Sequence, residues 1–277
     1  MTAIAIWRND EAPSHPSLWV AADSRVTAQR HTVLVEDAAK VLSLPIVCRA
    51  QNQEGFFTEV YHSHSVGYCF AGSTLMGQNV YLGLTPLLSN LISPVRYVPS
   101  LEDVAAHLFS YLRRSFDDFK VRAGSTAMFE AAMFGACPRT KSLCVYHFRP
   151  KLKEGVYELT CTRHATLQDG EFVYLGDESI RVSQAIADAR TEPCLPGRPK
   201  SRLPRYVIED FINDPTYETI GGDVQLAVAD WAGFRPYILC KPRVPGEPQA
   251  YLSYLGRELT EDIRTVGHAI VGGPAMI

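Results

Sequence analysis

The order of the predicted strands and helices is the feature that most constrains how this chain can fold. Short apolar runs rich in β-branched residues predict strands near both ends of the chain and again in its middle. Two pairs of helix-like segments separate these strand groups, at 75–92 and 101–119 and at 179–189 and 206–211. Helices gathered between groups of mostly antiparallel strands are typical of two packed sheets with helices outside, and they exclude the simple alternation of a Rossmann fold.

The first two strands predict a hairpin that returns the chain to its own start. Apolar runs at 3–7 and 18–22 flank a turn-rich segment at 9–16 that contains proline. Because the two strands pair side by side, Asp23, which directly follows the second strand, is expected to lie beside Thr2.

A buried strand at 66–73 ends in small residues, Ala71-Gly72-Ser73, and leads into a helix. Backbone N–H groups at the start of a helix lack partners within it, so such a terminus is suited to an oxyanion. The polar segment 49–65 is predicted to be an inserted loop or hairpin. Further strands are predicted at 33–35, 40–47, 224–228 and 236–240, and those at 126–148, 157–161 and 172–175 are predicted to form a second sheet.

Composition indicates a globular protein. The 277 residues are 46% hydrophobic and 21% charged, which is enough to bury a large core as one large domain or two small ones. We expect a single domain over 1–277, with a core at about 2–240 and a C-terminal extension at 241–277. The net charge of −3 gives no electrostatic reason to expect nucleic acid or an anionic membrane as a partner. No apolar run approaches the ~20 residues that span a bilayer, and no signal peptide is evident, so a cytoplasmic protein is expected.

Cysteine and histidine spacing favours neither a metal nor a disulfide framework. The seven cysteines are scattered and never form a CxxC pair, so free thiols in a reducing compartment are expected. His62 and His64 have the alternate spacing that puts two ligands on one face of a strand. No third ligand is evident, so neither a metal nor another cofactor is expected.

Met1-Thr2 is the first candidate for chemistry. If Met1 is removed, Thr2 carries a hydroxyl nucleophile and a free α-amine, which together are a complete nucleophile and base pair. The α-amine has an unperturbed pKa of roughly 7.7–8.0, so it can accept a proton near neutral pH.

Five short motifs follow one another along the chain in a specific order. They are Met1-Thr2, Ala21-Ala22-Asp23-Ser24-Arg25-Val26-Thr27, Lys40 about one strand later, Phe70-Ala71-Gly72 before a helix, and Gly221-Gly222-Asp223-Val224 before a late strand. Together they resemble the proteasome β-subunit family of N-terminal-nucleophile (Ntn) hydrolases, and in particular its HslV-like bacterial peptidases. The resemblance covers roughly residues 2–240 and implies an α+β fold, a four-layer αββα sandwich of two mostly antiparallel sheets covered by helices.

The resemblance also implies a role for each matching residue. Thr2 would be the nucleophile with its own α-amine as the base, Lys40 would favour the alkoxide, and Asp23 would hold Lys40 in place. The backbone N–H of Gly72 would form the oxyanion hole. The matching substrate-binding positions are Arg25 and Thr27, for an extended substrate backbone, and Val26, Ala38 and Thr74, for a pocket that prefers small-to-medium apolar or neutral groups.

Two segments depart from the family pattern. Where the family commonly has Gly-Ser-Gly, the chain has Gly176-Asp177-Glu178, and where the family has an Asp and a Ser before the late Gly-Gly pair, it has Tyr217 and Ile220. Asp214 is a candidate substitute for the missing Asp. The carboxylate of Asp177 is expected either to pull on Lys40 or to raise the pKa of the Thr2 amine.

Three functions stay open on these residues. The first is a proteasome-like threonine peptidase or amidase that cleaves peptides in a homo-oligomeric ring and works with an unfoldase partner or without one. The second is a non-proteolytic Ntn amidohydrolase that acts on a small amide, and the third is an inactive structural subunit with the same fold. Retention of Thr2, Asp23 and Lys40 argues against the third.

Overall fold

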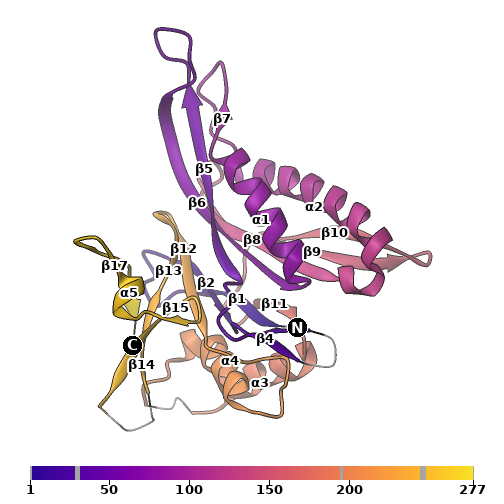
Figure 1. Cartoon of the computed structure of the whole chain (residues 1–277), viewed down its shortest axis with the longest axis vertical. Helices are drawn as coiled ribbons and strands as arrows, with labels where there is room; N and C mark the ends of the chain where they lie inside the picture. Colours follow the sequence, from indigo (N-terminus) through magenta and orange to yellow (C-terminus); the bar gives the residue numbers. More distant parts are fainter. Residues whose placement is uncertain (1, 29–31, 194–195, 244–247, 277) are drawn as a thin grey trace.

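The fold is mixed α/β and rich in strands. Met1 and Cys194 lie outside the residues that the computed structural model describes, which are 2–28, 32–193, 196–243 and 248–276. Two large sheets, each with a pair of helices against it, make up most of these residues, and a smaller sheet lies near the C-terminus (Figure 1). No helix in the described ranges is long and apolar enough to cross a membrane.

One large sheet combines the predicted N-terminal hairpin with strands from late in the chain. Its order is β11 (Phe172–Gly176), β1 (Ala3–Asn9), β2 (Ser17–Ala22), β12 (Gln225–Asp230) and β13 (Gly233–Pro236), with every neighbouring pair antiparallel. The hairpin prediction is confirmed, with Ile4 opposite Ala22. The prediction that 172–175 belongs to the second sheet is wrong, because β11 pairs with β1. A local pattern predicts a strand, whereas its partner is chosen by long-range pairing.

The other large sheet is built mainly from the middle of the chain. Its order is β10 (Val156–His164), β9 (Ser142–Lys153), β8 (Phe129–Cys137), β6 (Glu59–Gly72), β5 (Val41–Ala50) and β7 (Leu91–Ile92). The segment 49–65 lies at the far end of the long β5–β6 hairpin, which extends away from the other sheet in Figure 1. Strand β7 pairs in parallel with β5, so residues 91–92 are not part of the helix predicted there.

Helices α1 (Thr74–Leu88) and α2 (Leu101–Ala123) pack on this second sheet. The hydroxyl of Ser73 caps α1 by accepting the N–H of Met76 at 3.4 Å. Ser100 and Asp103 form a capping box at the start of α2. One apolar cluster joins the helices to the sheet and includes Tyr68, Leu84, Leu108, Phe116 and Phe148.

Helices α3 (Ser179–Thr191) and α4 (Leu203–Asn213) pack on the sheet that contains β1. As a result, β1 is buried on both faces. Ala3, Ala5 and Trp7 belong to the cluster with α3 and α4, whereas Ile4 and Ile6 belong to a cluster that includes residues of both large sheets. A strand buried on both faces is fixed in position, so the residue before it, Thr2, is held at a defined place at the edge of the core.

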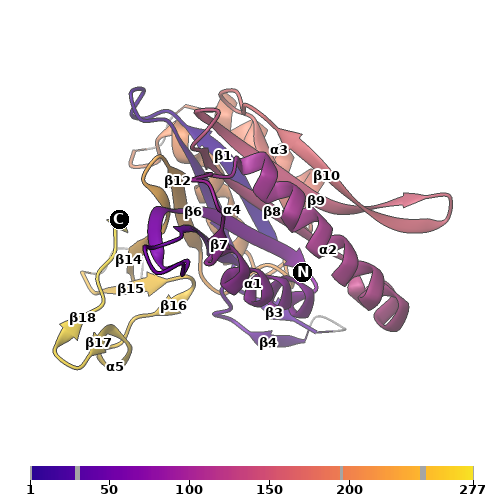
Figure 2. The ribbon, with the colours of Figure 1, turned by 90° about the horizontal axis from the view of Figure 1, so that it is seen from above.

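The C-terminal residues form short elements on one side of the molecule. They are β14 (Ile238–Pro242), β15 (Ala250–Tyr254), β16 (Arg257–Glu258), α5 (Glu261–Arg264), β17 (Thr265–Val266), β18 (Ala269–Ile270) and β19 (Ala275–Met276). In Figure 2 they lie on the side opposite the β9–β10 hairpin. Residues 244–247 of the predicted C-terminal extension lie outside the described residues.

A glycine brings this C-terminal part against the loop that follows β2. Gly256 has φ +86°, and a Cβ there would lie 2.3 Å from Cβ of Ser24. Nearby, Lys241 on β14 pairs with Glu209 on α4 at 2.9 Å and also with Asp223. The extension therefore packs on the segment that leads to the candidate site.

Candidate active site

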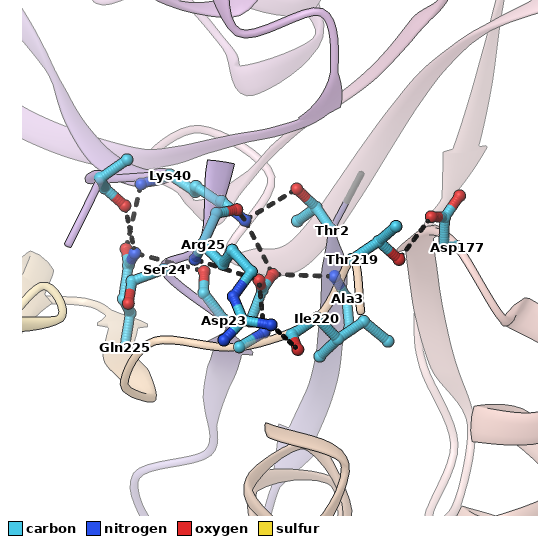
Figure 3. A network of polar contacts seen from close by, with 12 residues as sticks. Thr2, Ala3, Asp23, Ser24, Arg25, Lys40, Asp177, Thr219, Ile220 and Gln225 are labelled. Atoms are coloured by element: carbon cyan, nitrogen blue, oxygen red, sulfur yellow. Dashed lines mark hydrogen bonds and ion pairs between the residues drawn. The ribbon is translucent and has the colours of Figure 1, made fainter. Parts of the chain in front are cut away.

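Lys40 lies at the centre of a buried polar network (Figure 3). It directly precedes β5, its side chain is 2% exposed, and its Nζ lies 2.8 Å from Oγ1 of Thr2 and 2.9 Å from Oδ1 of Asp23. The Nζ also donates to the backbone oxygen of Arg25. An ammonium has three N–H donors, and these three acceptors match them. Burial lowers the pKa of Lys40, and the neighbouring Asp23 carboxylate opposes that shift.

Asp23 is fully buried and holds this network together. Its Oδ1 accepts the N–H of Ala3 at 2.9 Å, and its Oδ2 accepts the N–H groups of Arg25 at 3.2 Å and Gly221 at 3.3 Å. The bond to Ala3 confirms that the hairpin brings Asp23 to the start of β1. With Lys40 as a fourth donor, the buried carboxylate has enough partners to offset its lost hydration.

Gln225, the first residue of β12, fixes the backbone around Lys40 but is not among the predicted site residues. Its Oε1 accepts the N–H groups of Lys40 at 3.0 Å and Val41 at 3.3 Å, and its Nε2 donates to the backbone oxygens of Asp23 at 3.3 Å and Ala38 at 2.7 Å. It is fully buried. The available signal was an amide side chain at the start of an apolar strand pattern, where only a satisfied polar group is tolerated.

A cavity of about 750 Å³ opens beside Thr2. The residues that line it are Thr2, Val26, Thr27, Ala28, Leu34, Ala71, Gly72, Ser73, Thr74, Thr126, Met128, Phe129, Glu130, Pro150, Gly176 and Asp177. Gly72 has φ +87° at the end of β6, directly before the α1 cap. Gly176 has φ +107°, and a Cβ there would lie 1.9 Å from the backbone oxygen of Thr2. Only glycine allows β11 to come this close to Thr2.

The predicted pocket residues divide into two groups. Val26, Thr27 and Thr74 line the cavity. Ala38 is outside the described lining, and its N–H donates to the backbone oxygen of Ser24 at 2.9 Å. Ala38 therefore helps to shape the loop before Lys40, and the structure does not bring it to the cavity.

Arg25 is also outside the described cavity lining. Its Nε lies 2.9 Å from Oε2 of Glu36, and its Nη1 donates to the backbone oxygens of Glu218 at 3.1 Å and Ile220 at 3.4 Å. Its guanidinium links the loop after β2 to the loop before β12. The guanidinium of Arg25 is therefore held by Glu36 and the loop before β12, and its role in substrate binding stays a prediction.

Asp177 lies on the other side of Thr2 from Lys40 in the view of Figure 3. Its N–H donates to the backbone oxygen of Thr2 at 2.8 Å, and its Oδ2 accepts the hydroxyl of Thr219 at 2.9 Å. Burial raises the pKa of Asp177, and the Thr219 hydrogen bond opposes that shift. The Asp177 carboxylate raises the pKa of Lys40, but less than burial, Asp23 or Arg25 shift it, so its pull on Lys40 is small.

The structure does not bring Asp214 to the network. It follows α4, and its carboxylate accepts the N–H of Thr216 at 2.9 Å, so it does not take the place of the missing Asp. Ile220 is 1% exposed in the apolar cluster beside α3 and α4, and Tyr217 stacks on Phe211 with 4.4 Å between ring centroids. At these two positions the chain has packing side chains where the family has polar ones.

No described cysteine or histidine forms a hydrogen bond with Thr2, Asp23 or Lys40. The described cysteines are free thiols, and four are buried: Cys48, Cys69, Cys137 and Cys144. The rings of His62 and His64 have centroids 6.2 Å apart on β6. Among the described residues, no three His, Cys, Asp or Glu side chains are grouped so that they could hold a metal ion.

The fold is shared with solved structures of Anbu proteins. The Anbu complex from Pseudomonas aeruginosa, described as a helical assembly, is 14% identical with a TM-score of 0.54, over 92% of this chain and 87% of that one. An Anbu (Gly-1) mutant from Hyphomicrobium sp. strain MC1 and Anbu (ancestral beta-subunit) from Yersinia bercovieri are each 13% identical, with TM-scores of 0.52 and 0.50, over 83% of this chain and 82% of theirs. No protein-family model and no curated protein sequence matches the chain.

These comparisons correct the family inferred from the sequence motifs. Assignment to the proteasome β-subunit or HslV-like family is wrong, because no family model supports it and the similar structures are Anbu proteins. The motifs consist of a few residues that shape one site, such as Asp23 beside Lys40 and glycines at tight approaches. Families that share a fold can share those requirements, so short motifs do not separate one family from another.

Proposed function

We propose that this protein hydrolyses amide bonds, with Thr2 acting as an N-terminal nucleophile after removal of Met1. The observation that carries the proposal is the 2.8 Å contact between Nζ of Lys40 and Oγ1 of Thr2, at the edge of a cavity. A buried cation beside a hydroxyl favours the alkoxide that attacks a carbonyl. Met1 lies outside the described residues, so its removal is part of the proposal.

In the proposed reaction, Oγ1 of Thr2 attacks the substrate carbonyl carbon, and its proton passes to the α-amine of Thr2, directly or through a water. The N–H of Gly72 stabilises the oxyanion, and Asp23 holds Lys40 beside the reacting oxygen. The C–N bond then breaks, the leaving amine takes the proton, and an ester remains on Thr2. Water attacks this ester, its proton passes to the α-amine and then to Oγ1 of Thr2, and the substrate acid departs.

The proposal extends to the architecture and assembly. A four-layer αββα Ntn-hydrolase arrangement within a single domain is supported by helix pairs on both large sheets and by an apolar cluster with residues of both sheets. Assembly into a homo-oligomer is supported by the fold shared with the helical Anbu assembly of Pseudomonas aeruginosa. A cytoplasmic location belongs to the same proposal and is supported by the scattered free cysteines, and an unfoldase partner is supported by the sequence motifs.

The size of the cavity favours a second candidate substrate class, a small amide in place of a polypeptide. Its volume of about 750 Å³ falls within the roughly 300–1,000 Å³ typical of small-molecule sites. Thr2, Lys40 and Asp23 would have the same roles in this non-proteolytic amidohydrolase. Parallel assays with an unfolded protein and with short acyl amides separate the two candidates.

The test combines intact-mass measurement with an electrophile directed at N-terminal threonine. We expect the purified protein to lack Met1 and to gain one adduct at Thr2, and we expect Thr2→Ala to gain none. Ser110→Ala, which removes an exposed hydroxyl on α2, is the matched control and should gain the adduct. Retention of Met1 together with no adduct on the wild-type protein would contradict the proposal.

A further inference from the structure

Glu130 is a charged group of the cavity wall that the proposed reaction leaves without a role. It lies in β8, and its side chain is 34% exposed. Side chains along a strand alternate between its faces. Phe129 and Ala131 belong to the cluster with α1 and α2, and Ala132 belongs to the cluster shared by the two sheets. Glu130 therefore faces the space between the sheets, where the cavity opens beside Thr2.

A buried histidine holds one oxygen of the Glu130 carboxylate. His147 on β9 has a side chain that is 7% exposed, and its Nε2 lies 3.1 Å from Oε2 of Glu130. Within the described part of the chain, Oε1 of Glu130 has no hydrogen-bond partner. The carboxylate is thus fixed through one oxygen, and the other is left to bind a further donor.

The charged residues in the described part of the cavity lining are all acidic. Glu130 and Asp177 are acidic, and the described lining contains no Lys, Arg or His. Asp177 lies on the nucleophile side of the cavity, where its backbone N–H donates to the backbone oxygen of Thr2 and its Oδ2 accepts the hydroxyl of Thr219. The other lining residues are mostly apolar or small, and the larger apolar ones besides Phe129, whose side chain packs in the cluster with α1 and α2, are Val26, Leu34, Met128 and Pro150.

We propose that this cavity binds the cationic end of a substrate side chain, an ammonium or guanidinium on an alkyl stem, and that Glu130 determines this specificity. A cation donates charge-assisted hydrogen bonds to the free oxygen of the carboxylate. The alkyl stem packs against the apolar wall, as the stems of Lys and Arg do on protein surfaces. This inference rests on the proposed function for the position of the reacting bond, and it replaces the neutral pocket expected from Val26, Ala38 and Thr74.

The test measures binding to the Thr2→Ala protein, in which turnover is blocked. Two pairs of peptide amides, lysine against norleucine and arginine against citrulline, match in shape and differ in charge. We expect the cationic member of each pair to bind about ten- to a hundredfold more tightly, because a hydrogen bond to a charged group contributes about that factor. If the Thr2→Ala protein binds both members of each pair with equal dissociation constants, the inference is wrong, and no second variant is needed to show it.

Glu130→Gln in the same background identifies the residue responsible. Glutamine keeps an oxygen that can accept from His147 and removes the charge, so the fold should survive and the preference should disappear. Glu158→Gln, an exposed carboxylate on β10, is the matched control and should keep the preference. A preference that persists unchanged in Glu130→Gln would contradict the assignment.

The same reagents separate this inference from the proposed function. A preference for cations that depends on Glu130, in a wild-type protein that neither hydrolyses amides nor forms the Thr2 adduct, would reject the proposed function and leave the inference standing. Hydrolysis of the neutral and cationic amides with equal kcat/KM by the wild-type protein would support the function and overturn the inference.

Discussion

Two ion pairs near the candidate site, Lys40–Asp23 and Arg25–Glu36, have the same length but differ greatly in exposure to solvent. Nζ of Lys40 and Oδ1 of Asp23 are 2.9 Å apart, with side chains 2% and 0% exposed. Nε of Arg25 and Oε2 of Glu36 are also 2.9 Å apart, with side chains 23% and 51% exposed. Breaking the buried pair leaves a charge without water or partner, whereas water and salt replace the exposed pair. Burial, rather than distance, therefore decides what each pair contributes to stability.

Of the substitutions that test this comparison, Lys40→Met is expected to lower the free energy of unfolding most. Asp23 would stay buried without its cation, and breaking one partner of a buried pair costs about 3–5 kcal/mol of unfolding free energy. Urea unfolding followed by the fluorescence of Trp7 and Trp19, both buried, measures it. The double variant Lys40→Met/Asp23→Leu should lose less than the sum of the single variants. A loss below about 1 kcal/mol for Lys40→Met would show that the buried pair contributes no more to stability than an exposed pair does.

Gln225→Leu tests whether the buried network depends on neutral groups as well as on charges. Leucine would leave the N–H of Lys40 and the backbone oxygen of Ala38 without the partners that Gln225 provides, and each buried orphan group costs about 1–3 kcal/mol. The same urea titration measures the change. Gln184→Leu on the exposed face of α3 is the matched control and should change the midpoint little. Equal midpoints for the two variants would show that Gln225 is dispensable.

The Asp177 carboxylate is less buried than that of Asp23, and its effect on unfolding stability is expected to depend on pH. Burial raises its pKa in the folded protein above the unfolded value of ~3.9, so its contribution to stability is fully present below that value and is lost as pH rises through the folded-state pKa. Asp177→Asn cannot ionise and should gain stability relative to the wild-type protein as pH rises from about 4 to 7. Urea midpoints at both pH values measure this, with the exposed Asp169→Asn as the control. If the gain in stability of Asp177→Asn shrinks as pH rises, the pKa of Asp177 is lowered in the folded protein and the prediction is wrong.

Glu36→Gln should have the smallest effect. It removes the charge of an exposed pair, which is worth about 0.2–1 kcal/mol, and leaves the backbone oxygen that accepts the Ser24 hydroxyl. The difference from the wild-type protein should shrink further in 0.5 M salt, because exposed charges are screened. A loss as large as that of Lys40→Met would show that the Arg25 link is as important as the buried network.

The sequence predicted the parts of the site that depend on local pattern. Two short apolar runs and a proline-containing turn predicted the β1–β2 hairpin, and that hairpin brings Asp23 to the start of β1. The sequence did not separate Arg25 from Val26 and Thr27, although only the last two line the cavity. These three residues are consecutive, and the direction of each side chain depends on how the loop packs against residues far along the chain.

The sequence therefore predicted the N-terminal hairpin and most of the longer strands and helices, because hydrophobic period and turn chemistry are local properties. That hairpin also predicted the place of Asp23 beside Thr2, whereas the role of Lys40 came from the resemblance of its motif to a known family. Only the tertiary structure decided that β11 pairs with β1, that Gln225 supports Lys40, that Asp214 lies apart, and that Glu130 reaches the cavity from the other sheet. Those outcomes depend on which distant strands pair and which faces are buried together. Strand pairing and the burial of faces are set by contacts between residues far apart in the sequence, so a local sequence pattern does not predict them.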